Sequence, residues 1–149
     1  MTLLDQLGAI VRALEHADIE YALVGGLAVA VWGAPRATQD IDLLVRPESV
    51  DAVVAVVEPL GFRFRALPIT FRDGMQLQRV SKIENGALLT IDLILVDANL
   101  EPAWASRVQL DLDGVPIWVI SRAALIQMKV AAGRPQDAAD IEKLEELDR

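Results

Sequence analysis

The sequence predicts an α/β (α+β) fold, in which helices pack against a mixed, twisted sheet and two further helices lie at the C-terminal end. Three observations support this prediction. Segments with helical spacing of apolar residues alternate with short apolar segments, an Asn-Gly pair separates two segments of alternating polarity, and a Gly-Arg-Pro break divides a helical C-terminal region. The 149 residues contain no linker, repeat or low-complexity tract, so we expect a single domain over residues 1–149.

The first part of the chain predicts a helix, a strand and a second helix. Apolar residues at positions 3, 4, 7, 10, 11 and 14 keep helical spacing, so the first helix should end near residues 15–16. The apolar segment 20–24 predicts a short strand. This strand leads into Gly25-Gly26 and a helix of small residues over 27–32.

The next elements are a strand, a helix and two half-exposed strands. The second strand is expected over 41–45, and Pro47 then precedes a helix with apolar residues at helical spacing from 50 to 57. Segments 62–65 and 75–83 alternate apolar and polar residues, as strands with one exposed face do.

The last part of the chain predicts a hairpin, one more strand and two helices. The Asn-Gly pair at 85–86 favours a two-residue turn, and segment 87–96 is the returning strand. A further strand is expected over 115–120. We expect Gly133 to end the first C-terminal helix and Pro135 to begin the second.

The composition excludes several classes of function. The absence of cysteine excludes disulfides, thiolate zinc sites and cysteine nucleophiles. No apolar run approaches the ~20 residues of a membrane span, and the N-terminus lacks a secretory signal, so we expect a cytoplasmic protein with no membrane partner. The net charge of −8 disfavours broad nucleic-acid binding.

Five cations in the middle of the chain contrast with this acidic balance. They could together hold a phosphate backbone, although solvated strand faces are the favoured interpretation. These cations are Arg63, Arg65, Arg72, Arg79 and Lys82.

Three aspartates form the candidate chemical centre. Asp40 and Asp42 are two residues apart in a strand, so their carboxylates should project from the same face. Asp92 interrupts the apolar segment 88–96, where an ionised carboxylate is costly unless it is paired or bound to a metal. A loop cap or a pair with Arg36 would explain Asp40 alone. The three acids together predict a site for a hard divalent cation such as Mg²⁺.

Gly25 and Gly26 lie where the first strand turns into a helix. Glycines at such a turn let the backbone approach a ligand closely, and the first N–H groups of the helix favour a phosphate. A tight turn alone also requires glycine. The pair therefore indicates a phosphate site only in combination with the aspartates.

Three segments of the chain contain recognisable motifs, and they are Leu23–Ala28, Gly33–Leu44 and Lys129–Asp140. Together they resemble the signature of the nucleotidyltransferase superfamily to which DNA polymerase beta belongs. Within it the chain is most similar to abortive-infection type toxin nucleotidyltransferases and small antibiotic nucleotidyltransferases. These share the pattern Pro-Arg-x-Thr-x-Asp-x-Asp and a late Lys followed by Gly-Arg-x-x-Asp-x-x-Asp. The resemblance covers roughly residues 21–144 and implies a nucleotidyltransferase fold.

The resemblance implies an enzyme that moves a nucleoside monophosphate from a nucleoside triphosphate to an acceptor hydroxyl and releases pyrophosphate. Asp40, Asp42 and Asp92 would be catalytic and would bind two Mg²⁺ ions, and Asp92 could also accept the hydroxyl proton. Contacts to the triphosphate would come from Gly25, Gly26, Arg36, Thr38 and Lys129.

The late motif contains further charged residues. Lys129 can reach a phosphate, which the resemblance favours, or extend its ammonium group to water. Asp137 and Asp140 share the apolar face of the last helix. We expect both to fasten that helix by pairing with Arg134, Lys129 or backbone donors.

The acceptor, the donor base and the partners stay open. A tRNA end, a protein hydroxyl and a small aminoglycoside-like alcohol all present the same attacking oxygen. The enzyme could be the toxin of a toxin–antitoxin pair, with a cognate antitoxin or another partner protein. The alternative from a different class is a non-catalytic binding or antitoxin module that keeps this fold and acts through a partner protein.

Overall fold

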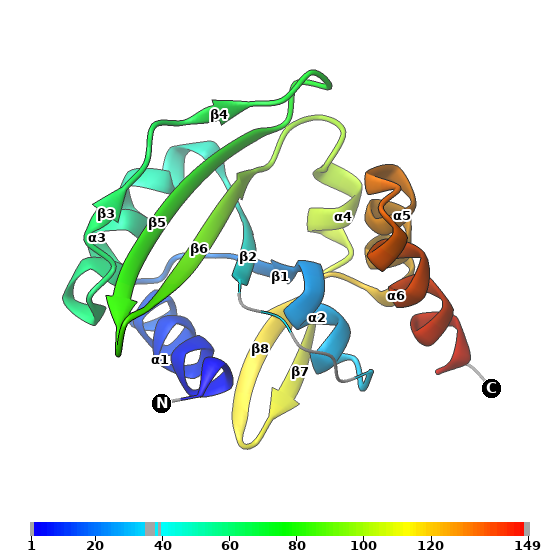
Figure 1. Cartoon of the computed structure of the whole chain (residues 1–149), viewed down its shortest axis with the longest axis horizontal. Coiled ribbons are helices and arrows are strands. Elements are labelled where there is room, and N and C mark those ends of the chain that lie inside the picture. Colours follow the sequence, from blue (N-terminus) through cyan, green and yellow to red (C-terminus); the bar gives the residue numbers. More distant parts are fainter. Residues whose placement is uncertain (1, 35–37, 39, 148–149) are drawn as a thin grey trace.

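The computed structural model of the chain describes residues 2–34, 38 and 40–147, and Figure 1 shows helices packed around a twisted sheet. The α-helices are α1 (Leu3–His16), α2 (Gly25–Val31), α3 (Val50–Val57), α4 (Glu101–Ala105), α5 (Arg122–Ala132) and α6 (Pro135–Glu146), and two 3₁₀ turns flank α3 at Pro47–Ser49 and Glu58–Leu60. The strands are β1 (Ala22–Val24), β2 (Asp40–Val45), β3 (Phe64–Arg65), β4 (Ile69–Thr70), β5 (Gln76–Glu84), β6 (Ala87–Leu95), β7 (Val108–Leu112) and β8 (Val115–Val119).

The sheet is mixed, as expected from the sequence. The strand order is β3-β5-β6-β2-β1-β8-β7, and β4 pairs with β5 beside β3. The pairs β2–β6 and β1–β8 are parallel, and the remaining pairs are antiparallel. Strand β2 lies between β1 and β6, so residues from two distant parts of the sequence flank it.

Helices α1 and α3 cover one face of the sheet. The Thr2–Asp5 capping box begins α1, whose apolar stripe is buried and which contacts α3. Ile41, Leu43, Ile91 and Leu93 are fully buried. Their alternation along β2 and β6 places the aspartates of these strands on the opposite face.

The five central cations do not form one patch. Lys82 is buried, and its Nζ lies 2.9 Å from Gln6 Oε1 of α1 and 3.0 Å from the Leu60 carbonyl oxygen. Arg65 pairs with Asp51 of α3 at 2.8 Å, whereas Arg79 lies on the opposite face of the sheet. The expectation of solvated strand faces is therefore wrong for Lys82, and a shared phosphate-binding surface is not formed.

Most predicted elements are confirmed, and three short ones were not predicted. The helix expected from residue 27 begins already at Gly25. Gly133 in the left-handed region ends α5, and Pro135 begins α6, as expected. No helix in the described part of the chain is long and apolar enough to cross a membrane. The elements that the sequence did not indicate are α4, β4 and β7.

Candidate active site

The three predicted acids share one face of the sheet near its centre. In the parallel pairing of β2 with β6, Asp42 is directly opposite Asp92, and Asp40 is opposite Thr90. On the other side of β2, Asp42 is opposite Val24, the last residue of β1. The register thus brings Asp42 and Asp92 together although 49 residues separate them in the sequence.

Gly25 makes room for one of these carboxylates. The residue has a φ of +73°, and a Cβ atom built on it would lie 2.1 Å from Asp42 Oδ2. No other residue type leaves this space or adopts this backbone conformation without strain. The requirement for glycine at position 25 therefore comes from both the positive φ and the Asp42 carboxylate. Gly26 is buried within the first turn of α2.

The electrostatic environment of Asp42 favours a bound cation. Burial and the neighbouring carboxylates of Asp92 and Asp40 raise the pKa of Asp42 to about 7, although the positive charges of Lys129 and Arg134 act in the opposite direction. Close carboxylates repel one another unless a positive charge lies between them. Carboxylate oxygens are also the ligands that Mg²⁺ prefers. The donor set therefore fits a hard divalent cation.

Asp92 has a partner that was not predicted. Arg79 on the neighbouring strand β5 donates from Nε to Asp92 Oδ1 at 2.7 Å and from Nη2 to Asp92 Oδ2 at 3.1 Å. The side chain of Asp92 is only 8% exposed, whereas that of Arg79 is 45% exposed. The cost of burying a carboxylate in this strand is thus offset by a guanidinium.

The predicted hairpin turn contains the signal that would have identified this pair. A two-residue turn at Asn85-Gly86 pairs residues at equal distances before and after it. Arg79 lies six residues before Asn85, and Asp92 lies six residues after Gly86. The structure has this register, with Arg79 opposite Asp92.

The side chains as they stand do not form a complete metal site. Within residues 2–34, 38 and 40–147, no three His, Cys, Asp or Glu side chains converge closely enough to hold a metal ion. Both carboxylate oxygens of Asp92 are engaged by Arg79. The availability of Asp92 as a metal ligand therefore depends on the position of the Arg79 side chain.

A buried cluster of charges fastens α6 to α5 beside the acids. Lys129 Nζ lies 3.2 Å from Asp137 Oδ1 and 3.0 Å from Asp140 Oδ2, and all three side chains are buried. Arg134 donates from Nε to Asp137 Oδ2 at 2.7 Å and from Nη2 to Asp137 Oδ1 at 3.0 Å. The structural role expected for Asp137 and Asp140 is confirmed.

The predicted phosphate contacts differ in where the structure places them. Lys129 is within electrostatic reach of Asp42, but its ammonium group already contacts two carboxylates. Thr38 is partly exposed, and Arg36 lies outside the described residues. Arg134 was expected only as a partner for α6, yet its side chain is 66% exposed and also acts on the pKa of Asp42.

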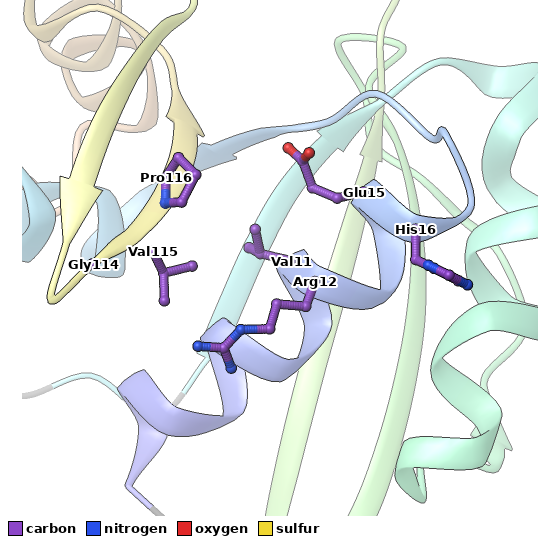
Figure 2. A pocket seen from close by; sticks show the side chains of 7 residues that line it. All are labelled: Val11, Arg12, Glu15, His16, Gly114, Val115 and Pro116. Atoms are coloured by element: carbon purple, nitrogen blue, oxygen red, sulfur yellow. The ribbon is translucent and has the colours of Figure 1, made fainter.

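A cavity of about 440 Å³ lies between α1 and the turn of the β7–β8 hairpin, where Figure 2 shows its lining side chains. None of the predicted site residues lines it. The lining mixes charged and apolar side chains and has no group of carboxylates, so it lacks the chemistry of the acids on β2 and β6. The lining residues are Val11, Arg12, Glu15, His16, Gly114, Val115 and Pro116.

Comparison with known proteins identifies the family and the fold of the chain. A family described as "Nucleotidyltransferase of unknown function" (DUF6036) matches residues 2–148. A Thermotoga maritima protein assigned as a nucleotidyltransferase has a TM-score of 0.70 at 18% identity, over 98% of this chain and 93% of its own. The antibiotic-resistance protein ANT(2'')-Ia, in complex with adenylyl-2''-tobramycin, has a TM-score of 0.67 at 19% identity. The match covers 97% of this chain and 88% of the ANT(2'')-Ia chain.

A third solved structure, JHP933 from Helicobacter pylori, has a TM-score of 0.55 at 19% identity, over 94% of this chain and 63% of its own. A sequence comparison with curated proteins finds no match. At these identities the solved structures establish the shared fold, and the family match identifies the class of enzyme.

Proposed function

Because the chain belongs to the nucleotidyltransferase family DUF6036, we propose that it transfers a nucleoside monophosphate from a nucleoside triphosphate to an acceptor hydroxyl at Asp40, Asp42 and Asp92. The observation that carries this proposal is the register of β2 and β6, which places Asp42 beside Asp92 on a face that also contains Asp40. Gly25 leaves the space that the Asp42 carboxylate needs.

The three acids would hold divalent cations, for which we propose two Mg²⁺ ions. Bound Mg²⁺ neutralises the phosphate charge and increases the acidity of the attacking hydroxyl. Asp40 and Asp42 offer adjacent carboxylates from one strand, and Asp92 offers a third from the next. Burial, followed by the charges of Asp92 and Asp40, raises the pKa of Asp42, and a bound cation would offset these effects.

The chemical step that we propose conserves atoms and charge. The acceptor oxygen forms a bond to the α-phosphorus as the bond between that phosphorus and pyrophosphate breaks. The proton of the acceptor hydroxyl passes to the Asp92 carboxylate. Positive groups then need to stabilise the leaving pyrophosphate.

The candidate contacts to the triphosphate come from two sides of the acids. Backbone N–H groups at Gly25 and Gly26 and the hydroxyl of Thr38 lie on the segments that flank β2. On the other side, the exposed guanidinium of Arg134 supplements Lys129, which has two carboxylate partners. Arg36 remains a sequence-based proposal.

The neighbour ANT(2'')-Ia with its adenylyl-2''-tobramycin suggests the first substrates to test, which are ATP and an amino-sugar alcohol. A tRNA end or a protein hydroxyl would present the same attacking oxygen. A cognate antitoxin or another partner protein would be identified by co-purification with the chain.

The test is pyrophosphate release from each of the four nucleoside triphosphates, with and without Mg²⁺, in the presence of candidate acceptors. Asp42→Asn should abolish Mg²⁺-dependent release while the protein stays folded. Asp18→Asn is a matched control, because Asp18 lies outside the site and has a φ of 56° that asparagine also adopts. Triphosphate binding without pyrophosphate release in the presence of any of the acceptors would instead favour the non-catalytic module.

A further inference from the structure

We infer that Arg79 is a positioning residue that holds Asp92 in the metal-free protein and competes with a divalent cation for its carboxylate. This inference rests on the proposed function, because it concerns the availability of one of the three proposed ligands. It assigns a role to a side chain that lies outside the three sequence segments that resemble the superfamily signature.

The geometry of the pair is that of a strong two-point contact. Arg79 and Asp92 are directly opposite one another on the antiparallel strands β5 and β6. The two hydrogen bonds, of 2.7 Å and 3.1 Å, engage one oxygen each. A guanidinium in this arrangement faces both carboxylate oxygens at once. A cation cannot approach Asp92 from that side until the arginine moves.

The unequal exposure of the two side chains indicates which partner can leave. Asp92 is almost fully buried, so its carboxylate requires a positive partner in every state. Arg79 is 45% exposed and reaches the carboxylate from the surface, so water can solvate its guanidinium after it moves away. Asp92 therefore exchanges one cation for another, and Arg79 is the partner that can be replaced.

The surroundings of Arg79 support this competition. The pKa of Arg79 is raised most by its hydrogen bond with Asp92, less by the charge of Asp92, and least by the charges of Asp40 and Asp42. The guanidinium therefore interacts with all three proposed ligands. The lack of a converged three-carboxylate group in the described residues agrees with an arginine that occupies this position.

Lys129 provides a contrast within the same region. Its side chain is only 6% exposed and lies between two carboxylates of α6, which serve to attach that helix. If this ammonium group moved into water, two buried carboxylates would lose a positive partner. Exchange is thus a property of Arg79 and not of every cation near the acids.

The experiment measures Mn²⁺ binding by electron paramagnetic resonance in the absence of nucleotide. We compare the wild type, Arg79→Gln, Asp92→Asn and the double variant. Arg79→Gln should bind Mn²⁺ about five-fold more tightly, the factor that corresponds to the upper range for a partly exposed ion pair. In the Asp92→Asn background the same substitution should change the affinity by much less, because no carboxylate remains for which to compete.

Two further variants keep the test interpretable. Arg65→Gln removes a strand arginine whose partner, Asp51, lies on the opposite face, and it should leave Mn²⁺ affinity unchanged. Arg79→Lys keeps the charge but loses the two-point contact, so its affinity should lie between those of the wild type and Arg79→Gln. Circular dichroism and thermal unfolding establish that each variant is folded, and Arg79→Lys replaces Arg79→Gln in the comparison if the latter does not fold.

Three outcomes would overturn the inference. Unchanged or weaker Mn²⁺ binding by Arg79→Gln would make the pair a permanent structural contact. If Arg79→Gln increased the Mn²⁺ affinity equally in the Asp92→Asn background, the effect would come from the loss of one positive charge near the site and not from competition for Asp92. Absence of Mn²⁺ binding by the wild type would remove the competition altogether. A separate measurement of pyrophosphate release by the wild type distinguishes the two proposals. If the wild type releases pyrophosphate but one of these three outcomes is observed, the proposed function stands and only the role of Arg79 is refuted.

Discussion

Replacement of Asp42 by asparagine should stabilise the metal-free protein at alkaline pH. Burial and the carboxylates of Asp92 and Asp40 raise the pKa of Asp42 to about 7, from 3.8 in the absence of these effects. The folded protein therefore holds the proton more tightly than the unfolded chain does. Asparagine has nearly the shape of the protonated aspartate and carries no charge at any pH, so it removes the cost of ionisation.

The size of this effect follows from the difference between the two pKa values. Each pKa unit corresponds to about 1.4 kcal/mol, so ionisation of Asp42 at pH 8 costs the folded state up to about 4 kcal/mol. Asp42 keeps some contact with solvent, so we expect about 2 to 4 kcal/mol. The cost is absent below pH 4, grows as the pH rises from about 4 to 7, and is constant above that range.

The assay is urea unfolding at pH 4 and pH 8, in the presence of EDTA. Asp42→Asn should be more stable than the wild type at pH 8 and nearly equal to it at pH 4. Addition of Mg²⁺ at pH 8 should then stabilise the wild type and leave the variant unchanged, since the cation neutralises the same repulsion. Equal stability of the two proteins at both pH values would refute the assignment of Asp42 as a strained carboxylate.

Three other substitutions test the surrounding structure by urea or acid unfolding. Gly25→Ala should lose at least about 2 kcal/mol more than Gly86→Ala, because both glycines have positive φ but only the first lies against the Asp42 carboxylate; equal losses would exclude the collision. Lys129→Met should lose about 3–5 kcal/mol, because buried carboxylates remain without their ammonium partner; a neutral effect would contradict this. The pKa of Asp137 is lowered to about 2, chiefly by the Arg134 hydrogen bonds, so its contribution of about 2 kcal/mol is present above pH 4 and lost as the pH falls through 2. Acid titration of Asp137→Asn should lack this loss.

The sequence was sufficient to predict elements with a clear periodicity or a strong terminal signal. The first helix, the Asn-Gly hairpin and the Gly-Arg-Pro break between α5 and α6 are all found where expected. The elements that were not predicted are short. Helix α4 has five residues and β4 has two, so each is too short for its periodicity to be recognised in the sequence. Strand β7 is an edge strand with mostly exposed residues.

The sequence predicted which residues form the candidate site, but it did not predict which of them lie opposite one another in the sheet. The alternation of Asp40 and Asp42 on one strand follows from local geometry, and the structure places both on one face. Their proximity to Asp92 depends on a parallel pairing between distant segments, which no local pattern specifies. Arg79 was assigned to a general basic patch, although the predicted turn already fixed its place opposite Asp92.

The register of β2 and β6 has a consequence for how relatives of this chain can diversify. The position of Asp42 opposite Asp92 is set within the two strands, so insertions or deletions between Val45 and Ala87 do not shift it. A one-residue slip inside either strand would move its aspartate to the opposite face. The length of the connecting loops can therefore change without altering the spacing of the two carboxylates.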